Sequence, residues 1–186
     1  LAAKLLSEGE LIAYFQGTSE IGPRALGNRS ILANPAKPNI KEILNFKVKD
    51  REFFRPYAAA VLKKFANGFF IMPKFFSPAM YYMLVALEVK KNKRHLVPGI
   101  VHIDNTSRVQ IVDNKINPNL NDLLLKFYNL TGIPLLLNTS FNKAEPIVHS
   151  PQDALETFAK LQSVKYLLID NYFIEKDDST HSTYQK

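Results

Sequence analysis

The chain has 186 residues, 46% of them hydrophobic, a net charge of +7 and no cysteine. Its length suits one domain, and the lack of cysteine excludes disulfides, thiolate nucleophiles and cysteine-ligated metals. No apolar run approaches the roughly 20 residues of a membrane span and no signal peptide is visible, so a cytoplasmic location is the default expectation.

The first nine residues are typical of the end of a helix that is already under way, and the first of them is not methionine. We therefore expect a fragment of a longer protein, with a single domain over residues 1–186. Residues 11–15 predict a buried strand closed by Gly17, and a polar loop follows over 18–28. A helix is predicted over 40–46, where apolar residues share one face. Further strands are predicted at 31–33, 58–62, 81–89, 99–103 and 108–112.

The clearest predicted helix covers residues 118–130, with Asn117 as its cap, Pro118 at its first position and Gly132 after its end. A buried strand over 133–137 leads into a polar run. A second helix begins at Ser150, whose spacing to Asp153 is that of a capping box. Two strands at 166–169 and 172–174 precede a polar tail, 175–186. Helices and strands alternate, so the class is α/β or α+β.

Residues 22–30, Gly-Pro-Arg-Ala-Leu-Gly-Asn-Arg-Ser, combine two arginines with glycines in one loop. Arginine binds phosphate and carboxylate oxygens in pairs, and glycine allows a backbone to approach a ligand closely. Arg24, Asn28 and Arg29 are therefore candidate ligands of an anion. The alternative is a tight turn whose arginines form ion pairs with a carboxylate such as Glu20.

Lys49, Arg51 and Arg55 lie within seven residues. On an extended strand they would share one face, where like charges repel unless an anion lies among them. The alternative is a solvated basic edge strand. Arg108 begins a predicted strand and could face either the site or solvent.

Asn138, Ser140 and Asn142 follow a predicted strand directly, and loops at strand ends are where open α/β sheets bind ligands. The alternative is capping of a turn by these side chains. The four histidines show no spacing typical of a metal site, and the carboxylates form no evident pair, so no metal is expected within the chain.

Together these motifs resemble the C-terminal domain of the nodulation-type and antibiotic O-carbamoyltransferase family. The resemblance covers nearly the whole chain. It is carried by residues 20–30, by Lys-Asp-Arg-Glu at 49–52, by Phe-Arg-Pro-Tyr-Ala at 54–58, by Thr-Ser-Arg-Val-Gln at 106–110, by Leu-Asn-Thr-Ser-Phe-Asn at 137–142 and by Glu-Pro-Ile at 145–147.

The resemblance implies a YrdC-like domain, a twisted mixed α/β sheet flanked by helices with a basic concave face. Such a domain would bind ATP, as its Mg²⁺ complex, and carbamoyl phosphate, and would form carbamoyl-adenylate. A separate N-terminal, Kae-like domain, with its own metal and absent from this chain, would then transfer the carbamoyl group to an acceptor hydroxyl. That domain is the implied protein partner.

By the same resemblance, Lys49 with Arg51, and Ser140 with Asn142, match the Lys-x-Arg and Ser-x-Asn motifs of YrdC-like proteins. The resemblance implies a role for each residue. The phosphates and the carbamoyl group would be bound by Arg24, Lys49 and Arg55, the three implied catalytic residues. The nucleotide and the adenylate would be bound by Arg108, Ser140 and Asn142. Asn28, Arg29, Arg51 and Asn138 complete the implied binding set.

One segment departs from the family pattern, which reads Phe-Asn-x-x-Gly-Glu-Pro. Here residues 141–146 read Phe-Asn-Lys-Ala-Glu-Pro, one residue shorter and without the glycine. Two alternatives stay open beside the enzyme. One, which follows from the implied basic face, is a module that binds RNA, although the chain lacks the aromatic–glycine signatures of dedicated RNA modules. The other is a catalytically inactive domain.

Overall fold

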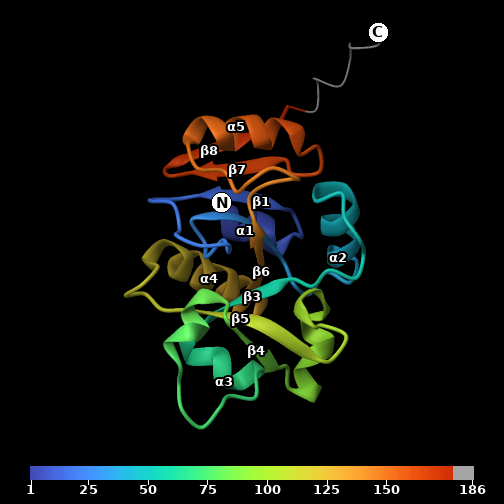
Figure 1. The fold of residues 1–186 in the computed structure, drawn as a ribbon, viewed down its shortest axis with the longest axis vertical. Coiled ribbons are helices and arrows are strands. Elements are labelled where there is room, and N and C mark those ends of the chain that lie inside the picture. Colours follow the sequence, from blue (N-terminus) through green and yellow to red (C-terminus); the bar gives the residue numbers. More distant parts are fainter. Residues whose placement is uncertain (178–186) are drawn as a thin grey trace.

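The computed structural model describes residues 1–177 (Figure 1). Within them the strands form one mixed sheet of eight, in the order β4-β5-β3-β6-β2-β1-β7-β8. The strands are β1 (Ile12–Phe15), β2 (Arg29–Ala33), β3 (Ala58–Leu62), β4 (Val85–Glu88), β5 (Thr106–Val112), β6 (Leu135–Ser140), β7 (Tyr166–Ile169) and β8 (Tyr172–Glu175). The predicted mixed α/β sheet with flanking helices is confirmed. From residue 178 on, the predicted polar tail lies outside the described residues.

The α-helices are α1 (Ala2–Ser7), α2 (Ile40–Glu42), α3 (Ala66–Phe69), α4 (Pro118–Thr131) and α5 (Pro151–Lys160). A π-helix, η1 (Ile43–Val48), continues α2. Short 3-10 helices are η2 (Lys63–Phe65), η3 (Pro78–Tyr82), η4 (Lys91–Leu96) and η5 (Pro98–Ile100). In the described part of the chain, no helix is long and apolar enough to cross a membrane.

Strand β6 lies in the middle of the sheet and pairs antiparallel with β3 on one side and with β2 on the other. Beyond β3 the order continues with β5, which is parallel to β3, and beyond β2 with β1 and β7, which are parallel to each other. The sheet thus has two groups of strands that meet at β6.

Two apolar layers cover the two faces of the sheet. Alternation along β6 sends Leu136 to the face packed by α1 and α4, and sends Leu135 and Leu137 to the face packed by α2, η1 and α5. Figure 1 shows α4 and α2 on opposite sides of β6. Each buried leucine of this kind contributes about 1.5–3 kcal/mol relative to an exposed one.

Helix α4 begins and ends as predicted. The side chain of Asn117 accepts a hydrogen bond from the backbone N–H of Leu120 at 3.0 Å, and Gly132 follows the helix in the left-handed conformation with φ of 72°. The predicted capping box of α5 is also present, between Ser150 and Asp153. Both helices therefore have a side-chain cap at the N-terminus, and the backbone N–H that follows each helix closes its C-terminus.

Two strand predictions differ from the structure: one is too long and the other is wrong. Of residues 81–89 only Val85–Glu88 is strand, because the preceding residues form η3, which is capped by Ser77. Residues 99–103 are no strand, since Pro98 starts the 3-10 helix η5. The N–H of Gly99 donates to the carbonyl of Pro35, and Gly99 packs directly against Ile40. Ile100 and Val101 of this segment thus serve packing rather than strand pairing, whereas Ile103 is exposed.

Candidate functional site

Three neighbouring strands place one residue each in a row across the sheet. Ala58 of β3 pairs with Asn138 of β6 on one side and with Arg108 of β5 on the other. Directly paired residues point to the same face, and two strand spacings put the outer two Cα atoms about 10 Å apart. Because Ala58 is small, space remains between its neighbours. A cavity of about 90 Å³ lies there, lined by all three residues.

The charges around this cavity have one sign. Among the described residues that line it, three are cationic, Arg24, Arg51 and Arg108, and none is acidic. Burial, followed by the charges of Arg24 and Arg51, lowers the pKa of the Arg108 guanidinium. The Nε of Arg108 is buried without a hydrogen-bond partner among residues 1–177. An anion in this cavity would relieve both the repulsion and the missing partner.

Asn45, a fully buried residue of the π-helix η1, holds Arg51 in place. Its Oδ1 accepts from the Arg51 Nε at 2.9 Å and from the Tyr57 hydroxyl at 2.6 Å. Its Nδ2 donates to the carbonyls of Phe53, at 3.0 Å, and Arg55, at 3.3 Å. The Arg51 guanidinium lies 4.8 Å from the centre of the Tyr57 ring. π-Helical turns are frequent at functional sites.

Residues 49–57 consequently form no strand, and the prediction that Lys49, Arg51 and Arg55 share a strand face is wrong. Lys49 caps the C-terminus of η1, and Asp50 follows with a positive φ of 47°. The segment then folds around the Asn45 side chain. A sequence pattern of alternating charges could not reveal this, because the organising residue lies upstream of the motif.

Lys49 joins the two motifs that were predicted to act together. Its buried Nζ donates to the carbonyl of Ser140 at 2.5 Å, and to the carbonyl and the Oδ1 of Asn142, both at 2.7 Å. The Ser140 hydroxyl donates to the same Oδ1 at 2.7 Å. Burial, and then the charge of Arg51, lowers the pKa of the Lys49 amine to about 7. Of this group, Ser140 lines the cavity.

The loop over residues 18–28 is tied to the edge of the cavity by its carbonyls. The carbonyl of Leu26 accepts from the side chains of Gln110 and Asn117, and the carbonyl of Ala25 accepts from Asn138. Gly27 has a φ of 105°, and a Cβ there would lie 2.5 Å from a methyl carbon of Leu120. These contacts hold the loop so that Arg24 lines the cavity.

The Glu20 carboxylate does not pair with an arginine, as the alternative interpretation of the loop required. It accepts from the backbone N–H groups of Leu26, at 2.9 Å, and Asn28, at 2.6 Å. The acidic side chain therefore shapes the loop and leaves Arg24 without a carboxylate partner among the described residues.

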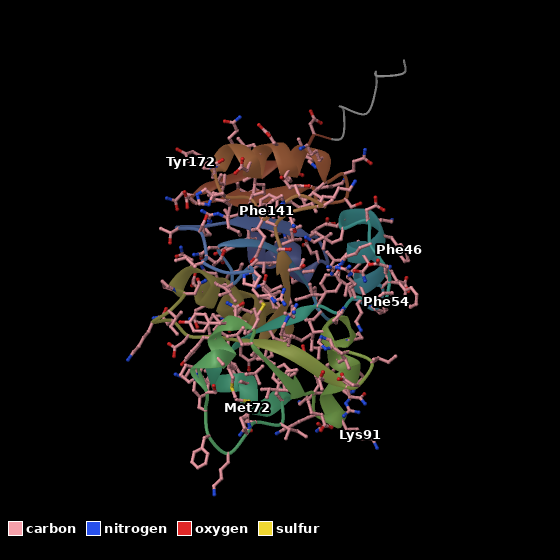
Figure 2. All side chains as sticks on the ribbon, viewed as in Figure 1. Phe46, Phe54, Met72, Lys91, Phe141 and Tyr172 are labelled. Carbon is pink, nitrogen blue, oxygen red and sulfur yellow. The ribbon has the colours of Figure 1, made fainter. Side chains whose placement is uncertain are left out.

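Five residues of the implied binding set do not line the cavity: Lys49 and Asn142, described above, and Asn28, Arg29 and Arg55. The buried Arg29 stacks 3.5 Å from the centre of the Phe15 ring and donates to the carbonyls of Gln16 and Gly17, at 2.8 and 3.0 Å. Asn28 donates its Nδ2 to the carbonyl of Thr18. Arg55 is exposed and pairs with Glu52 at 3.0 Å, next to Phe54 at the edge of the molecule (Figure 2).

The shortened loop after Asn142 closes on its own carboxylate. Glu145 accepts from the backbone N–H groups of Lys143, at 3.2 Å, and Ala144, at 3.1 Å, and from the hydroxyl of Thr157 at 3.0 Å. Burial opposes ionisation, but these hydrogen bonds outweigh it and lower the pKa of Glu145. The Asn142 Nδ2 donates to the carbonyl of Glu145. Without a glycine, the loop thus still has an ordered path.

Sequence reasoning missed Asn45 and Gln110. The signal for Gln110 was present, since it lies two residues after Arg108 on the same strand and so on the same face. The described residues contain no group of three or more histidine, cysteine, aspartate or glutamate side chains arranged to hold a metal ion.

Fold and site together define a mixed α/β domain with a cation-lined cavity on one face of its central strands. Residues 3–176 match the family model described as Carbamoyltransferase C-terminus, and the chain belongs to this family.

Curated relatives share this sequence over most of its length. Nodulation protein NolNO of Sinorhizobium fredii is 42% identical over 176 residues, which are 94% of this chain and 26% of that protein. Nodulation protein NolO of Bradyrhizobium diazoefficiens is 44% identical over 84% of this chain and 29% of its own length. The uncharacterized protein MJ1058 of Methanocaldococcus jannaschii is 38% identical over 95% of this chain and 28% of its own length. The chain therefore spans little more than a quarter of these relatives.

Two solved structures share the fold. Full-length HypF, in a phosphate- and nucleotide-bound form, superposes with a TM-score of 0.59 and 22% identity, over 91% of this chain and 20% of HypF. Sua5 of P. abyssi, complexed with L-threonine, superposes with a TM-score of 0.54 and 19% identity, over 93% of this chain and 46% of Sua5. The predicted YrdC-like fold is confirmed by this similarity.

Proposed function

We propose that this domain binds ATP and carbamoyl phosphate and joins the carbamoyl group to AMP. Forming this carbamoyl-adenylate consumes water and releases pyrophosphate from ATP and inorganic phosphate from carbamoyl phosphate. The rest of the full-length protein would then transfer the carbamoyl group to an acceptor hydroxyl. Mg²⁺ would enter bound to the nucleotide.

The observation that carries the proposal is the arginine-lined cavity. Arg24, Arg51 and Arg108 come from three separate segments, and no acidic side chain among the described lining residues balances them. Both proposed substrates are polyanions, and placing them side by side requires several cations. Phosphoryl and acyl-phosphate chemistry needs little beyond such positioning and charge neutralisation.

The second support is the connection between Lys49 and the Ser140–Asn142 segment, which brings the two nucleotide-site motifs implied by the sequence into direct contact. In the proposal Lys49 and Ser140 lie between the two substrates. Arg24, Arg51 and Arg108 bind phosphate oxygens. Arg29 and Asn28 act on the loop rather than on the ligand, and Arg55 acts from the rim.

Titration of ATP into the purified chain, with and without carbamoyl phosphate, tests this function. We expect saturable ATP binding that carbamoyl phosphate alters, and release of pyrophosphate that requires both substrates. An absence of ATP binding at millimolar concentration, with or without carbamoyl phosphate, would contradict the proposal. Steep weakening by salt without dependence on carbamoyl phosphate would instead favour nonspecific polyanion binding.

A further inference from the structure

Asn138 presents a buried hydrogen-bond acceptor beside the arginines. The residue lines the cavity and is only 1% exposed. Its Oδ1 has no hydrogen-bond partner among the described residues. A buried polar atom of this kind is costly unless a partner arrives, so each such atom in a folded protein requires an explanation.

The orientation of this amide is fixed by backbone groups that can only accept. Gln110 donates its Nε2 to the carbonyl of Leu26, so its Oε1 faces Asn138. Asn138 donates its Nδ2 to that oxygen at 2.8 Å and to the carbonyl of Ala25 at 3.3 Å. Reversing either amide would set two acceptors against each other. The Oδ1 of Asn138 is therefore held free as an acceptor.

We infer that Asn138 is the residue that selects the carbamoyl group, by accepting a hydrogen bond from its –NH₂. The inference rests on the proposed function and deepens it. The phosphate oxygens of ATP or of an acyl phosphate are mostly ionised at neutral pH and act as acceptors, so they do not satisfy Asn138. The missing partner is a donor, and in this inference it belongs to the molecule that also brings negative charge to Arg24, Arg51 and Arg108.

Carbamoyl phosphate meets both conditions in one small molecule. Its amide and its phosphate lie at opposite ends, and the cavity separates Asn138 from Arg108 in the same way across Ala58. The volume of about 90 Å³ has room for roughly six water molecules at about 15 Å³ each, which suits a small acyl phosphate better than a nucleoside. ATP also combines a donor, its adenine amino group, with negative charge, but its nucleoside is too large for a cavity of this volume.

Acetyl phosphate provides a matched probe, because a methyl group replaces the –NH₂ while the phosphate stays. We expect the unmodified chain to bind acetyl phosphate at least about tenfold more weakly than carbamoyl phosphate, since the methyl would leave the Oδ1 of Asn138 unpaired. Binding of inorganic phosphate, which has no carbamoyl group, serves as the reference for the affinity that the arginines provide. Equal affinities for the two acyl phosphates would overturn the inference.

Two variants separate Asn138 from general effects. In Asn138→Ala the preference for carbamoyl phosphate should shrink about tenfold while phosphate affinity holds within about threefold. Gln110→Met removes the group that orients Asn138 and should also reduce the preference, while Leu26 keeps its bond from Asn117. Asn119→Ala, on the exposed side of α4, is the control and should keep the preference.

The outcomes separate this inference from the proposed function. Failure of the function appears as absent ATP binding or as ATP binding that carbamoyl phosphate leaves unchanged. Failure of the inference appears in the ratio of the affinities for carbamoyl phosphate and acetyl phosphate. Either the unmodified chain binds the two equally, or Asn138→Ala and Gln110→Met keep the full preference for carbamoyl phosphate.

Discussion

The amine of Lys49 lies 2.7 Å from both the carbonyl and the side-chain oxygen of Asn142, a residue 93 positions further along the chain. This contact connects the end of the π-helix η1 to the loop after β6. A buried ammonium group held by several oxygens has a well-defined position but a depressed pKa, and both properties lead to measurable consequences.

The first prediction concerns protons taken up on binding. Burial and Arg51 lower the pKa of Lys49 to about 7, and a polyanion bound nearby should raise it again. At pH 8 the Lys49 amine is mostly neutral in the protein without ligand, so ATP or carbamoyl phosphate should bind with proton uptake. Affinity should fall by up to about tenfold per pH unit above 7 and level off below 7.

Calorimetry in buffers of different ionisation enthalpy measures this uptake directly. Lys49→Met should bind more weakly and show no uptake at pH 8. Uptake of the same size in Lys49→Met would assign the proton to another group.

The second prediction concerns Arg108. Arg108→Met should weaken binding of inorganic phosphate and carbamoyl phosphate by about 10–100-fold, because a charge-assisted hydrogen bond in a partly buried site is lost. Lys91→Met changes the net charge equally at an exposed position near the lower end of the molecule in Figure 2. It should change affinity less than about twofold at 0.15 M salt. Equal losses of affinity in the two variants would show that the overall charge of the chain, rather than the cavity, determines binding.

The third prediction concerns Asn45. Replacement by leucine keeps the volume but removes an amide that donates two hydrogen bonds and accepts two others within the 49–57 segment. It also removes the oxygen to which the buried Tyr57 hydroxyl donates. We expect a loss of about 2–4 kcal/mol in the free energy of unfolding, measured by urea denaturation. Asn119→Leu, on the surface, should stay within about 0.5 kcal/mol. A similar loss in the free energy of unfolding for Asn45→Leu and Asn119→Leu would show that other contacts hold the 49–57 segment.

The fourth prediction concerns Gly27. Alanine there must adopt a φ of 105° and would collide with Leu120, so the free energy of unfolding should fall by at least about 1–2 kcal/mol. Gly68→Ala is the matched control, because Gly68 is helical, exposed and has open space at its Cβ. It should be neutral or stabilise by up to about 1 kcal/mol. A larger loss in the free energy of unfolding for Gly68→Ala than for Gly27→Ala would mean that the 18–28 loop relaxes freely.

Much of the fold could be predicted because its signals are local. The cap at Asn117, the stop at Gly132 and the capping box of α5 depend on neighbouring residues only, and all are confirmed. The strand expected at 99–103 is wrong because the same apolar residues satisfy either strand pairing or packing against α2. Only the distant Ile40 and Pro35 decide between them.

The site was predictable by composition but not by geometry. Clustered arginines indicate an anion, yet they do not reveal which of them face it. Arg24 lines the cavity, whereas Arg29, five residues later, is buried against backbone carbonyls and Phe15. The difference depends on how the loop is anchored by Gln110 and Asn138, which are contributed by strands far away in the chain.

The central position of β6 has a consequence for how the domain assembles. Every strand before it along the chain belongs to one of two groups, β2 with β1 or β3 with β4 and β5, which hydrogen-bond to each other only through β6. During synthesis, residues 1–134 therefore expose the edges of β2 and β3 that β6 later covers, and the row from Arg108 to Asn138 does not yet exist. Ribosome-bound chains that end before β6 should be sensitive to protease and unable to bind phosphate.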